Sequence, residues 1–394
     1  MSAWKRVALR DVTQAVSTWN PTAKAMDEHF DYVDLSAIDQ DRKAIVGARR
    51  VACGEAPSRA RQLVASDDVL ISTVRPNLNG VARVPAELDG ATASTGFCVL
   101  RADRTSLSSG FLFHWVKSSL FVGDMVRKAT GASYPAVSDR IVLESLLALP
   151  PLPEQRRIAE VLDRAEALRV KRRAALAQLD SLTQSIFLDM FGDPARSRNK
   201  YVEGLGKHLL FLTSGGRGWA KFYAPSGSRF VRSLDVRMNH IGNDDIAFVS
   251  APKNAEAKRT RVTEGDVLLT ITGSRIGRVA AAPSELDGAY ISQHVAILRI
   301  DRSRLLPKFL SYFLSLDVGG QRQIAKSQYG QTKPGLNFEQ IERFKVPVPP
   351  MEMQLKFAMR VAAVDKLKAI HCAALAELDA LFASLQHRAF RGEL

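Results

Sequence analysis

The chain is poor in cysteine, contains no long apolar run and shows no metal-binding spacing. Its three cysteines, Cys53, Cys98 and Cys372, are odd in number and far apart, so they provide neither a disulfide framework nor a paired-cysteine metal site. No stretch approaches the roughly 18 uncharged apolar residues that a membrane span needs. The start of the chain also lacks the apolar core of a secretion signal. These absences predict a cytoplasmic protein without a structural metal.

Motifs for catalysis are missing as well. The seven histidines show no HExxH or other paired ligand spacing, and Gly204–His208 lacks the residues that cradle a phosphate. Neither Pro150-Pro151 nor Pro349-Pro350 follows the Asn or Asp that an amine methyltransferase would place there. We therefore expect a non-catalytic chain with no metal and no cofactor of its own.

Positive charge is what the chain has in excess. Its 55 Lys and Arg residues outnumber the 41 Asp and Glu residues, which leaves a formal net charge of +14. Such a surface is typical of proteins that neutralise phosphates, although it also fits anionic lipid or solubility alone. In the second half, basic residues interleave with aromatics, as at Arg217 and Lys221 around Trp219. We count Arg217 and Lys221 as candidate nucleic-acid contacts; the alternative is a solvated loop whose aromatics cover the core.

The chain contains an internal repeat. Residues 261–394 repeat residues 64–192 at an offset that drifts by only one residue; Asp68–Leu70, for example, reads again as Asp266–Leu268. The period of roughly 200 residues is far longer than the 20 to 50 of solenoids and propellers, so each copy can bury its own core. The sequence therefore predicts a tandem pair of domains.

Each copy closes on a proline step followed by a long amphipathic helix pattern. Positions that step by three and four form a heptad seam in each helix. The first seam comprises Ala165, Leu168, Arg172, Ala175, Leu179, Leu182 and Ile186. The second seam comprises Val364, Leu367, His371, Ala374, Leu378, Leu381 and Leu385. The polar interruption falls at the same step in both, which is typical of a residue that fixes register, although chance could also produce it.

These patterns together predict an α+β fold with a pseudo-twofold internal repeat. Two mixed α/β domains are expected at residues 1–150 and 196–347, each followed by a long spacer helix, at residues 151–195 and 348–394. Two helices of this length most simply bury their seams against each other. We therefore expect an antiparallel coiled coil.

Polar loops follow predicted strands in both domains. The strands Val69–Val74 and Val267–Thr272 each feed one loop, and residues 130–135 and 329–334 form another. Loops on a rigid scaffold are where base and phosphate contacts usually lie, although turn geometry alone explains the glycines and prolines. The candidate contacts in these loops are Arg75, Asn77, Asn79, Ser133, Tyr134, Ser274, Arg275, Gln331 and Lys333.

The proline step and the helix ends resemble a known family. Leu149–Ile158 and the helix end Phe191-Gly192 recur as Val348–Gln354 and Phe390–Gly392. Occurring twice at this spacing, these elements resemble the specificity subunit of type I restriction-modification systems, and the resemblance covers the whole chain.

The resemblance implies a DNA-recognition subunit. Each repeat would be a target recognition domain for one half of a bipartite, asymmetric sequence in double-stranded DNA. The paired helices would set the spacing and dock two methyltransferase subunits, which bind S-adenosylmethionine. Restriction would add motor nuclease subunits that use ATP and Mg.

Docking is assigned to the helices, including Glu154, Gln155 and Gln354. The second copy departs from the family's pattern where Met353 replaces Glu154. The competing hypothesis is a coiled-coil interaction scaffold whose basic loops bind an acidic partner other than DNA.

Overall fold

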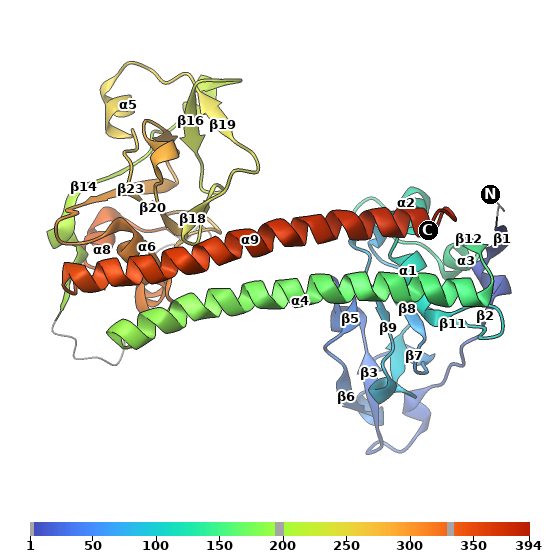
Figure 1. The fold of residues 1–394 in the computed structure, drawn as a ribbon. Coiled ribbons are helices and arrows are strands. Elements are labelled where there is room, and N and C mark those ends of the chain that lie inside the picture. The colour runs from blue at the N-terminus through green and yellow to red at the C-terminus, as the bar shows by residue number, and fades with distance from the viewer. Residues whose placement is uncertain (1–3, 194–200, 329–334) are drawn as a thin grey trace. The chain divides into compact units, whose positions relative to one another are not determined.

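The computed structural model describes residues 4–193, 201–328 and 335–394. By its internal contacts the chain divides into two compact units. Unit 1 comprises residues 1–174 and 372–394, and unit 2 comprises residues 175–371. Each unit holds one mixed α/β domain and one part of each long helix, α4 (Leu152–Phe191) and α9 (Met351–Ala389) (Figure 1). Within the described residues, no helix is long and apolar enough to cross a membrane.

The central sheet of unit 1 is antiparallel. Its strands lie in the order β2 (Thr13–Gln14), β11 (Phe97–Ala102), β8 (Val69–Ser72) and β9 (Val81–Arg83). Alternate residues of β8 enter different apolar clusters: Val69 and Ile71 pack with the helices, whereas Leu70 packs towards the second sheet. Because both faces are covered, the strand is a continuous apolar run rather than an alternating one.

Helices and a second sheet complete this domain. The helices are α1 (Ser109–Val116), α2 (Ser119–Lys128) and α3 (Asp139–Leu143). The second sheet has the order β6 (Arg49–Ala52), β3 (His29–Val33), β10 (Thr92–Ser94) and β7 (Ala60–Leu63). Smaller pairings join β1 (Lys5–Ala8) to β12 (Leu146–Leu149) and β4 (Ile38–Asp39) to β5 (Ala44–Ile45).

Unit 2 repeats this topology except at the edges of its second sheet. Its central sheet has the order β14 (Leu209–Ser214), β23 (Val295–Ile300), β20 (Val267–Thr270) and β21 (Val279–Ala281). Its second sheet has the order β15 (Tyr223–Ala224), β19 (Ala247–Val249), β16 (Ser228–Val231) and β22 (Tyr290–Ile291). The smaller pairings join β13 (Val202–Gly204) to β24 (Lys345–Pro347) and β17 (Val236–Arg237) to β18 (His240–Ile241). The helices are α5 (Ala255–Arg259), α6 (Pro307–Ser315), α7 (Arg322–Ser327) and α8 (Phe338–Glu342).

The structural repeat therefore begins well before residue 64, where the sequence repeat becomes recognisable. In each second sheet one strand pair is parallel: β3 with β10 in unit 1, and β16 with β22 in unit 2. The hairpins β4–β5 and β17–β18 also correspond.

A buried ion pair recurs in both central sheets. Arg101 donates to Asp68 and Arg299 donates to Asp266, each at 2.7 Å, and both carboxylates are buried. Each carboxylate also accepts a backbone N–H from the turn that precedes its strand. Charge-assisted bonds of this kind hold the start of β8 and of β20 in the same position.

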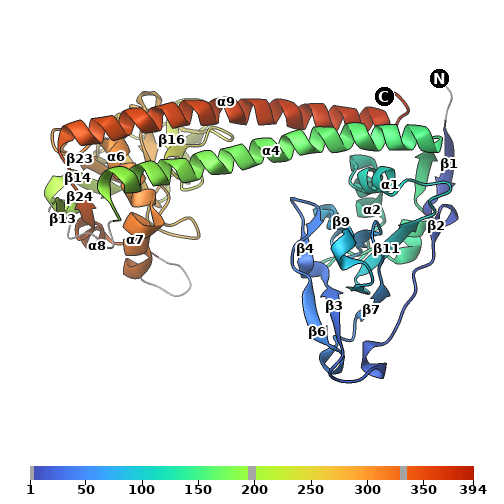
Figure 2. The ribbon, with the colours of Figure 1, turned by 60° about the horizontal axis from the view of Figure 1, so that its bottom comes forward.

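The long helices pair antiparallel within each unit. In unit 1, Arg169 of α4 binds Asp379 of α9 at 2.5 Å. In unit 2, Asp180 of α4 binds Lys368 of α9 at 2.7 Å, and Asp189 lies 3.8 Å from Arg360. The partner number on α9 falls as the number on α4 rises, and the paired stretches run side by side in Figures 1 and 2. These features confirm the predicted fold class.

Part of the predicted seam is wrong. Leu168, Leu182, Leu367 and Leu381 expose 53%, 43%, 48% and 50% of their surface, so they do not lie between the helices. The residue after each of them is the one that turns inward: Arg169, Thr183, Lys368 and Phe382.

The remaining seam positions are at least partly buried. Ala165 and Val364 are buried. The others are intermediate: Arg172, Ala175, Leu179, Ile186, His371, Ala374, Leu378 and Leu385.

Candidate nucleic-acid interface

The first candidate loop of unit 1 is held in a strained conformation. After β8 the chain forms a single helical turn, Pro76–Leu78, and the residue on either side of this turn is left-handed. Arg75 has φ +51° and Asn79 has φ +46°. Asparagine tolerates this conformation, but for an arginine it costs about 1 to 3 kcal/mol, so at Arg75 it persists only where the surroundings impose it. Such strain concentrates at functional sites.

The two candidate loops of unit 1 lie together. The backbone N–H of Arg75 donates to the carbonyl of Pro135 at 2.7 Å, and Val74 forms a β-bridge with Ala136. The Arg75 guanidinium lies 4.8 Å from the centroid of the Tyr134 ring, which is 69% exposed. Ser133 is exposed on the same loop. A cation over an exposed aromatic face presents both hydrogen-bond donors and a stacking surface to solvent.

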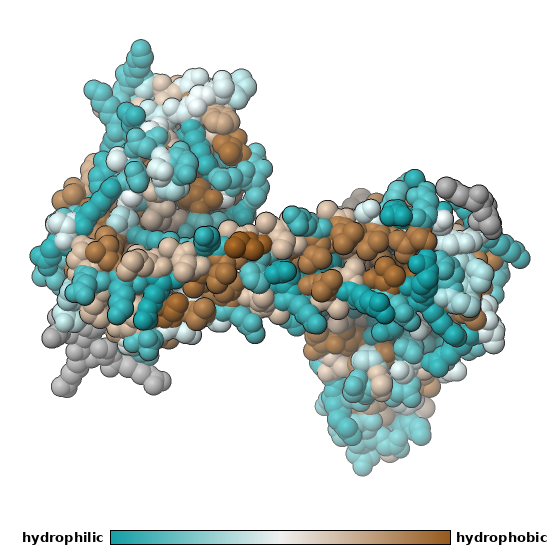
Figure 3. Space-filling model, viewed as in Figure 1, coloured by the Kyte–Doolittle hydropathy of each residue, from teal (hydrophilic) through white to brown (hydrophobic). Residues whose placement is uncertain are grey.

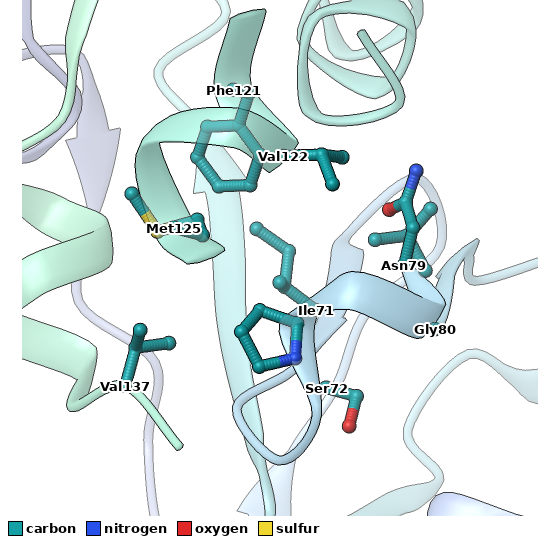
Figure 4. A pocket seen from close by; sticks show the side chains of 10 residues that line it. Ile71, Ser72, Asn79, Gly80, Phe121, Val122, Met125 and Val137 are labelled. Carbon is teal, nitrogen blue, oxygen red and sulfur yellow. The ribbon is translucent and has the colours of Figure 1, made fainter. Parts of the chain in front are cut away.

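Asn77 and Asn79 have different environments. Asn77 is exposed, whereas Asn79 is partly buried and its Nδ2 donates to the Lys117 carbonyl at 3.4 Å. Below Asn79 lies a narrow, largely apolar pocket whose walls include Ile71, Phe121 and Met125 (Figure 4). Asn79 therefore anchors the loop, and Asn77 is the amide that faces solvent.

Unit 2 forms the same loop with other residues. Gly273 has φ +88° and Gly277 has φ +87°, and these two glycines occupy the positions of Arg75 and Asn79 relative to the paired strands. Glycine adopts this conformation without strain. The loop thus keeps its backbone in both units, although only unit 1 places a cation and an amide at its strained ends.

Residues predicted for the unit 2 loop lie between these glycines. Arg275 is exposed, and its Nη1 donates to the Leu234 carbonyl at 3.3 Å. Ser274 is exposed as well. By position, Arg275 corresponds to Asn77 and not to Arg75, with which residue type alone would align it.

The second loop of unit 2 is followed by a residue that lies beside the start of the first loop. Thr272 forms a β-bridge with Gly335, which matches the bridge between Val74 and Ala136 in unit 1. Gln331 and Lys333, predicted at the tip of this loop, lie outside the described residues. The described bridge still places the residue that follows the second loop beside the start of the first loop, as in unit 1.

Arg217 and Lys221 are exposed on a neighbouring loop. The loop is held by Trp219, which is buried, stacks on Phe230 at 5.7 Å and donates to Glu256 at 2.9 Å. The aromatic is thus core, as the alternative interpretation had it, while the two cations face solvent.

Sequence reasoning overlooked two polar side chains beside the unit 2 loop. His294 immediately precedes β23, and its Nδ1 lies 2.5 Å from the Thr272 hydroxyl. Gln293 is exposed next to it, and Gly216 of the Arg217 loop forms a bridge with Ser292. The turn of residues 292–294 therefore joins the two basic loops. The sequence signal for these side chains is the polar Ser-Gln-His run directly before an apolar strand.

Gln155 and Gln354, predicted to dock partner subunits, are fully buried within the chain. Gln155 accepts the N–H of Ser108 and donates to the carbonyls of Ser106 and Pro150. Gln354 makes the three matching bonds at the same distances. Each glutamine fastens the start of a long helix to its domain, so neither presents a docking surface. Glu154 is partly exposed and binds Arg157 at 2.7 Å.

Two similar loop-bearing domains joined by paired helices define a class of protein with two separate binding surfaces. Residues 236–380 match the family model of the type I restriction modification DNA specificity domain. The chain is 26% identical over 364 residues to the type I restriction enzyme EcoKI specificity subunit of Escherichia coli K12, covering 84% of this chain and 76% of that protein.

Solved structures agree with this likeness. One chain, from a study of complex assembly and conformational transition in the type I R-M system, has a TM-score of 0.61 and 28% identity and covers 100% of this chain and 99% of its own. The type I restriction-modification S subunit from M. genitalium shares the fold, with a TM-score of 0.55, 14% identity and coverage of 98% and 96%. The predicted resemblance to type I specificity subunits, and with it the predicted class of function, DNA target recognition, is confirmed.

Proposed function

We propose that this chain is the DNA-recognition subunit of a type I restriction-modification complex, and that each domain reads one half of a bipartite, asymmetric target. The observation that carries this proposal is the shared loop backbone, with left-handed ends at Arg75 and Asn79 in unit 1 and at Gly273 and Gly277 in unit 2. The same backbone presents different side chains in the two units. One scaffold therefore supports two different readers.

The exposed side chains suit base recognition in the major groove. An arginine can donate two parallel bonds to guanine, and an asparagine can bond adenine in the same bidentate way. Unit 1 offers Arg75 and Asn77, and unit 2 offers Arg275 with Gln293 nearby. Arg217 and Lys221 are suited to phosphate contacts, which hold register without reading sequence.

The helices carry a matched pair of apolar surfaces. Leu168 and Leu381 are exposed on the paired helix stretch of unit 1, and their counterparts Leu367 and Leu182 are exposed on that of unit 2. Figure 3 shows apolar residues on the outer surface of both long helices. Exposed apolar residues that gather on one surface mark interaction sites. One such surface per unit supports two methyltransferase subunits, while the paired helices set the spacing between half-sites.

Chemistry in this proposal belongs to the partners. Among the described residues there is no group of three His, Cys, Asp or Glu side chains that could hold a metal ion. The methyltransferase subunits would bind S-adenosylmethionine, and motor nuclease subunits, where present, would use ATP and Mg. The complex would act on DNA in the cytoplasm. The comparisons give no support to the scaffold hypothesis with an acidic partner other than DNA.

The test is fluorescence anisotropy of labelled duplexes with the complex reconstituted from this chain and its methyltransferase. We expect one bipartite duplex to bind far more tightly than scrambled duplexes, with an affinity that falls steeply with salt. The chain alone should neither methylate nor cleave. If duplexes that differ at any base position all bind with equal affinity, the chain is not a specificity subunit, and a non-specific scaffold is favoured.

A further inference from the structure

Both domains place a left-handed residue other than glycine in the turn of their small hairpin. Lys43, in the turn between β4 and β5, has φ +53°, and Asn239, in the turn between β17 and β18, has φ +61°. Asparagine tolerates this conformation, but lysine does so rarely. The side chains of both residues reach out of the hairpin, and in each unit the hairpin contacts the neighbourhood of the candidate loop.

In unit 1 the hairpin binds the loop directly. The Lys43 ammonium donates to the backbone carbonyl of Asn79 at 2.6 Å, and Asn79 is the left-handed residue at which the loop ends. The Asn79 amide in turn donates to the Lys117 carbonyl at the end of α1. The Lys117 side chain is only 8% exposed, lies over the Phe113 ring at 4.5 Å and is 3.7 Å from Glu166 of α4. The loop end is thus held between the hairpin and a rigid helix.

In unit 2 the corresponding turn makes the equivalent connections with different atoms. The Asn239 N–H donates to the carbonyl of Val279, which begins the strand after the loop, at 2.8 Å. Its side chain donates to Ser315 and accepts from Ser311, both on α6 and both at 2.8 Å. The loop residue Arg275 donates to Leu234, just before the hairpin.

We propose that Lys43 and Asn239 are positioning residues that fix the contact loops in their reading conformation, and so set how well each half-site is discriminated. This inference depends on the proposed function. Neither side chain needs to touch DNA, because Lys43 acts through the loop that it binds and Asn239 acts through the hairpin that it fastens to α6. A charge-assisted bond to a carbonyl is among the stronger single hydrogen bonds, so losing it releases a loop that is already strained.

The experiment uses the full chain in its reconstituted complex. Affinities are measured for the target duplex and for duplexes with one changed base in either half. Lys43→Met keeps the aliphatic stem and removes the donor; we expect it to lose roughly tenfold in discrimination at the first half-site, with the second unchanged. Lys43→Arg keeps a donor of similar reach and should restore most of the loss. Lys24→Met is the matched control, since Lys24 is an exposed lysine of the same domain whose ion pair with Glu28 is 3.9 Å long.

Asn239→Gly provides an independent test in unit 2. Glycine keeps the left-handed turn but removes both side-chain bonds, so discrimination should fall at the second half-site only. This variant decides the matter if Lys43→Met does not fold.

Two results would overturn the inference while leaving the proposed function intact. One is unchanged discrimination at both half-sites in Lys43→Met and Asn239→Gly. The other is uniform weakening on all duplexes, with the slope of log affinity against log salt reduced by about one, because that is the signature of a lost phosphate contact. If the unaltered complex shows no sequence preference at all, the proposed function fails and this inference with it.

Discussion

Replacing Gln354 by leucine should destabilise unit 2 strongly, although the two side chains have similar volumes. Gln354 is fully buried, accepts the Leu306 N–H at 2.8 Å and donates to the carbonyls of Arg304 and Pro349 at 2.9 and 2.8 Å. Leucine would leave these three backbone groups, at partly or fully buried bonds, without their partner. A buried group left unsatisfied costs about 1 to 3 kcal/mol, so we expect a loss of about 3 to 5 kcal/mol.

The assay is urea unfolding followed by circular dichroism, with Gln155→Leu measured in parallel. Gln155 makes its three bonds at 2.8, 2.9 and 2.8 Å, so its loss should destabilise unit 1 by a similar amount. Gln178→Leu is the control, because Gln178 is exposed on α4 and its loss should change stability by less than about 0.5 kcal/mol. A loss below about 1 kcal/mol for Gln354→Leu would show that the glutamine does not fasten the helix to the domain.

Three further predictions concern recognition, spacing and pH. Arg75→Ala should relax the preference at the first half-site by about 1 to 3 kcal/mol and Arg275→Ala should do so at the second, as measured with single-base duplex variants; equal weakening of both halves would assign the contact to phosphate. Inserting seven residues into each long helix, after Ala174 in α4 and after His371 in α9, should lengthen the gap in the DNA target by about three base pairs. A helix rises about 1.5 Å per residue, and successive base pairs are about 3.4 Å apart. An unchanged gap would mean that the helices do not set the spacing. Burial holds the pKa of His114 below its usual value of 6.5, so near that pH the unfolded chain binds a proton that the folded chain does not. The free energy of unfolding should therefore fall as the pH drops through 6.5. Measuring the free energy of unfolding against pH for His114→Gln, which should lack this dependence, checks the sign.

The repeat could be predicted only where physical constraints preserve sequence. Asp68 and Asp266 recur because a buried carboxylate must be paired with Arg101 or Arg299. Strands of the second sheets need only apolar residues facing their core, which many sequences satisfy, so β3 and β16 share a topology without a readable likeness. The repeat was therefore predicted from residue 64 onwards and missed before it.

The helix seam shows a similar limit. A pattern of leucines predicted Leu168 and Leu381 as interior, but Arg169 and Phe382 take those places. Arginine can lie inward when its guanidinium finds a carboxylate, here Asp379, and an aromatic ring, here Phe382. A prediction based on hydropathy alone does not take such inward-facing arginines into account.

Both loops of unit 1 and the first loop of unit 2 were located correctly, but the correspondence between the units was not predictable from residue types. Arg75 and Arg275 invite alignment by charge, whereas the backbone pairs Arg75 with Gly273. Left-handed backbone at an arginine has no sequence signature. The part played by Lys43 in holding this loop was hidden for the same reason, since it depends on a contact between distant segments.

The central claim is that two differently equipped loops on one shared scaffold read two different DNA segments. Methylome sequencing of a host that expresses this chain with its methyltransferase tests it most directly. We predict one methylated motif made of two unlike halves with a gap of fixed length between them, and a change confined to one half when Arg75 is replaced. A single uninterrupted motif, or a motif whose two halves change together in that variant, would contradict the account.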